Sequence, residues 1–90
     1  MVRNIVRFKF SEPVEPYEVE DDVCLAIFAA ECLHGQPRVR LELSYLVDEA
    51  GSRCVLDVRG SAGEDAARIF TGLSTARVGE GSFKVERVFR

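Results

Sequence analysis

The first ten residues of the chain alternate between apolar and polar side chains. Most of the apolar ones share one face of an extended segment: Val2, Val6, Phe8 and Phe10. The other face is mainly basic and consists of Arg3, Ile5, Arg7 and Lys9. A period of two with one apolar face predicts a half-buried strand over Val2–Phe10.

The period changes in the next long segment. Glu12–Tyr17 contains two prolines, which interrupt regular helix and sheet hydrogen bonding, so we expect an extended loop there. Val19–His34 is predicted to be a helix, because three carboxylates fall in its first turn, where they favour the positive end of the helix dipole. Gly35 and Pro37 are typical of a helix end.

Alternation then returns in two neighbouring segments. Val39–Val47 and Arg53–Arg59 place apolar side chains at every second position, and the turn residues Asp48–Gly51 predict a hairpin between them. If those four turn residues are unpaired, the apolar partners are Leu41 with Val58, Leu43 with Leu56, and Tyr45 with Cys54. This register also sets Glu42 opposite Asp57, an unfavourable pair of like charges. A slip of two residues would relieve the repulsion and leave every side chain on its own face.

A second helix and a last strand complete the pattern. Ser61–Glu64 has the sequence of a capping box, with serine at the N-cap and glutamate three positions later. The helix behind it has an apolar stripe made of Ala66, Ile69, Phe70 and Leu73. Gly79–Gly81 is expected to end this helix, and Phe83–Phe89 to form a less regular strand.

The predicted order of elements is β-α-β-β-α-β, which is the ferredoxin-like pattern. Right-handed crossovers then place both helices on one face of an antiparallel four-stranded sheet with strand order 4-1-3-2. A length of 90 residues fits a single domain over positions 1–90. We therefore expect an α+β fold in which one face of the sheet stays open.

Composition narrows the class of protein further. With 47% hydrophobic residues and a net charge of −3, the chain is too apolar for a disordered protein. Its longest mainly apolar stretch, Val23–Leu33, is shorter than the roughly 20 residues that a membrane-spanning helix needs. Met1–Phe8 carries charges throughout and has no small-residue cleavage site, so no export signal is expected. These features predict a cytoplasmic protein whose three cysteines are reduced thiols.

The charges are distributed unevenly between the two expected sheet faces. The face away from the helices is expected to hold eight basic side chains: Arg3, Arg7, Lys9, Arg38, Arg40, Arg53, Arg59 and Lys84. Three acidic side chains share it: Glu42, Asp57 and Glu86. That face would carry a net charge of +5 in a chain whose total is −3, and six of the remaining acids lie between positions 12 and 22.

An open, partly basic sheet face has three interpretations. It can associate with a second copy or a protein partner through apolar residues set among mixed charges. It can bind a small anion or a nucleotide, or it can be a solvated surface of long charged side chains. RNA binding is less favoured, because the outward residues of the central strands include no aromatic side chain for base stacking. The residues expected to form this interface or ligand-binding site are Arg3, Ile5, Arg7, Arg53, Val55 and Arg59.

The first helix gives a second indication of association. Ten of the eleven residues in Val23–Leu33 are apolar, with Glu31 as the exception, which is more than one stripe against a sheet requires. The additional apolar side chains can pack on the second helix or contact a partner. We expect a homodimer or a small partner-binding subunit.

Catalytic and metal-binding patterns are weak. Cys24, Cys32 and Cys54 have no zinc-ligand spacing and form no Cys-x-x-Cys motif, so we expect them to be small buried hydrophobic residues. His34 is the single histidine, and it suits the negative end of the helix dipole better than it suits a nucleophile–base pair with Cys32, two residues away. The sequence therefore predicts a non-enzymatic protein with no metal and no cofactor.

Overall fold

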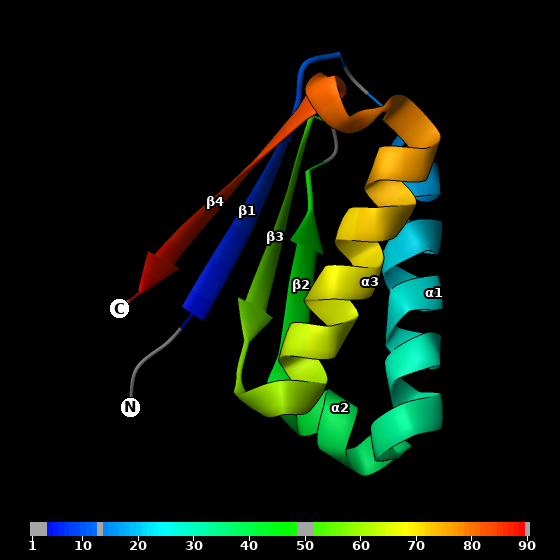
Figure 1. Ribbon diagram of the computed structural model, residues 1–90, viewed down its shortest axis with the longest axis vertical. Helices are drawn as coiled ribbons and strands as arrows, with labels where there is room; N and C mark the ends of the chain where they lie inside the picture. The colour runs from blue at the N-terminus through cyan, green and yellow to red at the C-terminus, as the bar shows by residue number, and fades with distance from the viewer. Residues whose placement is uncertain (1–3, 13, 49–51, 90) are drawn as a thin grey trace.

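The computed structural model describes residues 4–12, 14–48 and 52–89. The chain folds into two layers, a four-stranded antiparallel sheet and a layer of helices on one of its faces (Figure 1). The strands are β1 (Asn4–Phe10), β2 (Leu43–Val47), β3 (Arg53–Val58) and β4 (Phe83–Phe89). Their order is β2-β3-β1-β4, in which each strand has the same neighbours as in the predicted order 4-1-3-2, read from the opposite edge. The α+β class is confirmed.

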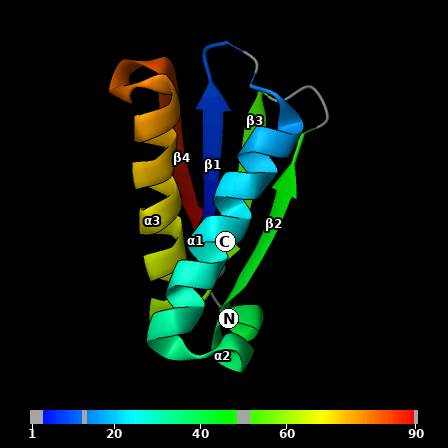
Figure 2. The same cartoon turned by 90° about the vertical axis from the view of Figure 1, so that its right-hand side faces the viewer.

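Three helices accompany the sheet, where two were expected. They are α1 (Pro16–His34), α2 (Gln36–Glu42) and α3 (Gly60–Val78), and a 3₁₀ turn, η1 (Glu80–Ser82), precedes β4. The two long helices, α1 and α3, lie side by side over the sheet, and α2 lies at one end of this layer (Figure 2). None of the helices in the described segments is long and apolar enough to cross a membrane.

The prediction of one strand over Val39–Val47 was wrong. The first part of that segment belongs to α2, and the extended chain begins only at Leu43. Pro37 lies in the first turn of α2, a position that suits proline because the first helical N–H has no partner within the helix. Pro37 therefore starts a new helix directly after α1. The loop expected over Glu12–Tyr17 is also shorter than predicted, because α1 begins at Pro16.

The β2–β3 hairpin uses the register that is shifted by two residues. Leu43 lies opposite Val58, Tyr45 opposite Leu56, and Val47 opposite Cys54. Asp57 consequently lies opposite Ser44, and its repulsive pairing with Glu42 does not arise. Because the shift is even, the side chains keep the faces that the alternation predicted.

The core lies between the sheet and the two long helices. Val6, Phe8 and Phe10 of β1 are buried, whereas Arg7 and Lys9 between them are exposed, as the alternation predicted. The centre of the core is Phe8, whose ring meets that of Phe70 of α3 edge to face, with 4.7 Å between centroids. A smaller cluster joins the three helices through Ala30, Val39, Ala62 and Ala66.

The predicted capping box at the start of α3 is absent. The N-cap residue is Arg59, and it makes no side-chain capping bond. The carboxylate of Glu42, at the end of α2, takes that role by accepting a hydrogen bond of 2.9 Å from the main-chain N–H of Ala62. The main-chain N–H of Arg59 also donates to the Glu42 carbonyl oxygen, at 2.7 Å. A residue from another element therefore accepts a hydrogen bond from one of the first N–H groups of the helix, which have no partner within it.

Two carboxylates near the start of α3 are expected to make the fold sensitive to acid. The hydrogen bond from Arg38 lowers the pKa of Glu42, and hydrogen bonds from Arg87 lower the pKa of Glu64. A carboxyl whose pKa is lower in the folded than in the unfolded chain stabilises the fold above its unfolded pKa, and this stabilisation is lost as the pH falls through the folded pKa. We therefore expect the urea concentration at the unfolding midpoint to stay constant at pH values above 4.5, the ordinary glutamate pKa. It should decrease as the pH is lowered below 4.5.

The control for this pH dependence is the double variant Glu42→Gln, Glu64→Gln. It removes both titrating groups and is expected to flatten the profile between about pH 6 and about pH 3.5, from a lower starting stability. The measurement is urea unfolding followed by circular dichroism across that range. An unchanged profile in the double variant would show that other carboxyls cause the acid sensitivity.

Candidate functional site

The open face of the sheet brings together most of the predicted site residues. Arg7 of β1 lies opposite Val55 of β3, and Ile5, two residues before Arg7 in β1, lies opposite Asp57. Arg53 starts β3 and lies opposite Lys9. Arg59 follows the end of β3, at the other end of that strand from Arg53. The predicted residue Arg3 lies outside the described residues.

A hollow of about 680 Å³ lies over the basic end of this face. Its lining includes Arg7, Lys9, Arg53, Val55, Lys84 and Glu86. Arg7 and Glu86 form a loose ion pair, with 3.8 Å between the nearest nitrogen and oxygen. The hollow is thus surrounded by four basic side chains and one acidic one.

The predicted charge of the open face needs a correction. Arg38, Arg40 and Glu42 belong to α2 and are not part of the sheet. Among the described strand residues, the open face has four basic side chains (Arg7, Lys9, Arg53 and Lys84) and two acidic ones (Asp57 and Glu86). Its net charge is therefore +2 within the described strands, lower than the expected +5.

A row of three cations crosses this face. Lys9 on β1 lies directly opposite Arg53 on β3, and it also lies directly opposite Lys84 on β4. Side chains that oppose each other in neighbouring antiparallel strands have their Cβ atoms roughly 4.5–5.5 Å apart, and like charges in such pairs are destabilising. In the described part of the chain, none of the three has an acidic partner within 4.0 Å.

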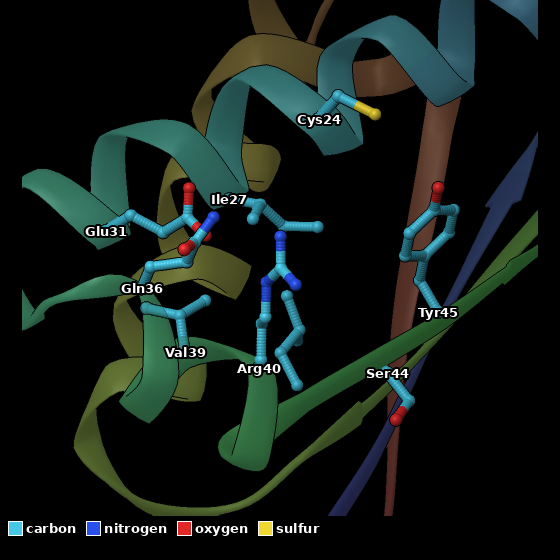
Figure 3. A pocket seen from close by; sticks show the side chains of 9 residues that line it. Cys24, Ile27, Glu31, Gln36, Val39, Arg40, Ser44 and Tyr45 are labelled. Atoms are coloured by element: carbon cyan, nitrogen blue, oxygen red, sulfur yellow. The ribbon is translucent and has the colours of Figure 1, made fainter.

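A second pocket, of about 450 Å³, opens between α1, α2 and β2 (Figure 3). Its walls include Cys24 and Ile27 of α1, Val39 and Arg40 of α2, and Tyr45 of β2. Figure 3 shows the Arg40 side chain extending from α2 toward Ile27. Arg40 has no hydrogen-bond or ion-pair partner among the described residues. Since the sequence did not predict α2, it gave no signal for this pocket.

Tyr45 sits where this pocket meets the edge of the sheet. Its hydroxyl donates a long hydrogen bond of 3.4 Å to Glu20 of α1. Partial burial, with Cys24 and Glu20 nearby, raises the pKa of Tyr45 to about 12. The phenol therefore stays protonated at neutral pH and acts as a hydrogen-bond donor rather than as a base.

The cysteines differ from one another in exposure. Cys54 is buried as predicted, and this burial raises its pKa to about 12, so the thiol is unreactive. Cys24 and Cys32 are exposed on α1, and their predicted burial is wrong. The described residues contain no group of three or more His, Cys, Asp or Glu side chains that could hold a metal ion.

His34 connects the two long helices. Its Nε2 lies 2.7 Å from Oδ2 of Asp65 on α3, so the imidazole joins the end of α1 to α3. No contact in the described structure joins His34 to a serine, threonine or cysteine side chain. The pair therefore lacks the adjacent nucleophile that a catalytic triad requires.

The outer surface of α1 carries several exposed apolar side chains. Tyr17, Leu25 and Phe28 are each at least half exposed, and Phe28 lies one turn after Cys24, which lines the pocket beside Tyr45. The apolar residues of this helix that are not needed against the sheet thus pack only partly on α3, and the others face outward.

Comparison with known protein families, curated proteins and solved structures finds no match for this chain.

Proposed function

We propose that this protein is a non-catalytic association module that forms a homodimer through the free edge of β2. One observation carries the proposal: within the described residues β2 is an edge strand with no strand on its outer side, it contains no charged residue, and oppositely charged side chains lie near its two ends. An exposed edge strand presents unpaired N–H and C=O groups to any strand that can align with it. Proteins that stay monomeric protect such edges with charges, prolines or bulges.

The two edges of the sheet differ in this respect. The sequence of β2 is LSYLV, whereas β4 contains Lys84, Glu86 and Arg87 within seven residues. Charged residues on β4 protect that edge from pairing. On β2, Leu46 is 70% exposed and Tyr45 is 37% exposed. The edge of β2 is therefore the more suitable edge for strand addition.

The charges at the two ends of β2 favour a second copy as the partner. The start of α1, with the exposed acids Glu20 and Asp21, lies beside the end of β2, and α2, with the exposed Arg40, precedes its beginning (Figure 2). A two-fold axis through the middle of β2 pairs the strands antiparallel and sets the beginning of each opposite the end of the other. Arg40 of one copy then approaches Glu20 of its partner.

The face-to-face dimer is less favourable. It would bring together two surfaces that each carry +2 over their described strands, so the predicted open-face residues are better suited to an anionic ligand than to a second copy. Pairing along β2 leaves that face free. It also brings the exposed apolar side of α1, including Phe28, toward the partner's matching surface.

Two finer expectations belong to the same proposal. We propose that the fold is a ferredoxin-like β-α-β-β-α-β arrangement in which α2 is inserted between the first helix and the second strand. We also propose a cytoplasmic location, because the free thiols of Cys24 and Cys32 are exposed and suit a reducing compartment.

Sedimentation velocity tests the dimer, and Leu46→Lys is the decisive variant. The parent protein should sediment at twice the 10.0 kDa mass of the chain at micromolar concentration. Leu46→Lys places a charge on the pairing edge and should weaken the dimer by roughly tenfold or more in Kd. The matched control is Leu33→Lys, because Leu33 is also 70% exposed but lies at the end of α1, and it should stay dimeric.

A charge exchange tests the orientation of the two copies. Arg40→Glu alone should weaken the dimer by roughly 3- to 10-fold, since the contact occurs twice in a two-fold dimer. Adding Glu20→Arg should recover the parent Kd. A monomeric parent protein, or equal Kd values for Leu46→Lys and Leu33→Lys, would overturn the proposal.

A further inference from the structure

We propose that the cation row on the open sheet face, Arg53–Lys9–Lys84 with Arg7 beside it, binds a small anion that carries two or more negative charges, of the phosphate or pyrophosphate type. This site is separate from the β2 edge and does not depend on the proposed dimer. Two observations support it: the register of β3 and β4 against β1, and the hollow that lies over these strands.

The register creates electrostatic repulsion that the fold itself does not require. Lys9 has a cation directly opposite on both sides, Arg53 and Lys84, and a neutral polar residue at position 9 would keep the same strand and the same core. Within the described residues, the three cations have no acidic partner within 4.0 Å. An anion with two or more charges placed among them would replace repulsion by attraction on all sides.

The shape of the face limits the size and the class of the ligand. The hollow of about 680 Å³ is lined by the three cations, Arg7 and the apolar side chain of Val55. Glu86, at the margin, pairs loosely with Arg7 and leaves the three other cations uncompensated. The outward residues of the described strands include no aromatic side chain, so the face offers no platform for stacking bases. A compact phosphate-type anion therefore fits better than a nucleic acid.

Thermal unfolding of the whole chain tests the site, with sodium pyrophosphate compared against sodium chloride at equal ionic strength. A ligand in large excess over its Kd stabilises the protein by mass action, so we expect pyrophosphate to raise Tm by at least about 5 °C over chloride. Inorganic phosphate, with less charge, should give a smaller rise. Equal Tm values in pyrophosphate and chloride would overturn the proposal.

Variants of the cation row provide a second test, because they should raise Tm in chloride and weaken the response to pyrophosphate. Lys9→Gln should raise Tm in chloride by roughly 1–4 °C, because it relieves both repulsive pairs, and it should abolish the response to pyrophosphate. Lys84→Gln, on the outer strand, should reduce the response. Arg68→Gln is the matched control, because Arg68 is an exposed arginine on α3, away from the sheet face, and its response should equal that of the parent protein.

Two further arms separate the possible outcomes. A monomeric parent protein with a full pyrophosphate response would overturn the dimer alone, and a dimeric parent protein without a response would overturn the anion site alone, so the two failures are distinguishable. A full response in Lys9→Gln would place the anion elsewhere and overturn the site. If a single-stranded oligonucleotide raises Tm at lower concentrations than pyrophosphate does, the ligand of this face is a nucleic acid and the small-anion proposal is overturned.

Discussion

Replacing Phe8 with alanine is expected to lower the free energy of unfolding by about 4 kcal/mol. The side chain has no exposed surface, and it occupies the middle of β1, a central strand of the sheet. Its ring contacts that of Phe70 edge to face, at 4.7 Å, and lies 6.3 Å from that of Phe83. Truncation removes these contacts and leaves a cavity that the sheet and helix cannot close. The measurement is urea unfolding followed by circular dichroism.

The control for Phe8 is an exposed apolar side chain outside the proposed dimer contact. Leu33 at the end of α1 is 70% exposed, so Leu33→Ala should change the free energy of unfolding by less than about 0.5 kcal/mol. Should Phe8→Ala fail to fold, Phe8→Leu gives a measurable loss of about 1–1.5 kcal/mol, because most of the volume is kept. A loss of less than 1 kcal/mol for Phe8→Ala would contradict the position of the core.

Residue alternation was sufficient to predict the sheet faces. Along β1, one apolar side chain follows every polar one, and only one assignment buries Val6, Phe8 and Phe10. The same parity placed Arg7, Arg53 and Val55 together on the open face before any register was known. A strand can slip by two residues without changing a face, which explains why the predicted hairpin partners were shifted although the faces were right.

Alternation of apolar and polar residues could not show whether the region around α2 is a helix or a strand. Apolar residues at positions 39, 41 and 43 fit a strand, but 39 and 43 are also one helical turn apart. The choice is made by distant contacts, because Val39 is buried with Ala30 of α1 and with Ala62 and Ala66 of α3. No short-range pattern reveals such a cluster.

The candidate sites differ in how far the sequence could predict them, because alternation sets the face of a side chain but not the register or the first residue of a strand. The open face depends on parity alone, whereas the cation row depends on the registers of both β3 and β4 against β1. The row therefore became visible only with the structure. The β2 edge depends on where the strand begins, and the sequence placed four residues of α2, 39–42, in that strand.

Two glycines of α3 should respond in opposite directions to the same substitution. Gly63 is buried, and an added Cβ would collide with the main-chain carbonyl oxygen of Glu42 and also approach Val58. Main-chain atoms cannot rotate away, so Gly63→Ala must push α2 from α3 and strain the hydrogen bond from Ala62 to Glu42. The expected loss is about 2 kcal/mol in the free energy of unfolding, within the usual range for overpacking.

Gly72 provides the matched control within the same helix, because nothing lies within 4 Å of an added Cβ there. Alanine loses less backbone entropy than glycine on entering a helix, so Gly72→Ala should raise the free energy of unfolding by about 0.5–1 kcal/mol. Urea unfolding of the two variants under identical conditions measures both effects. If both substitutions stabilise the protein, α2 is not packed closely against α3, and the capping role of Glu42 is lost with that contact. If only Gly63→Ala destabilises it, the close approach of the two helices fixes where β2 begins and thus which residues form the free edge of the sheet.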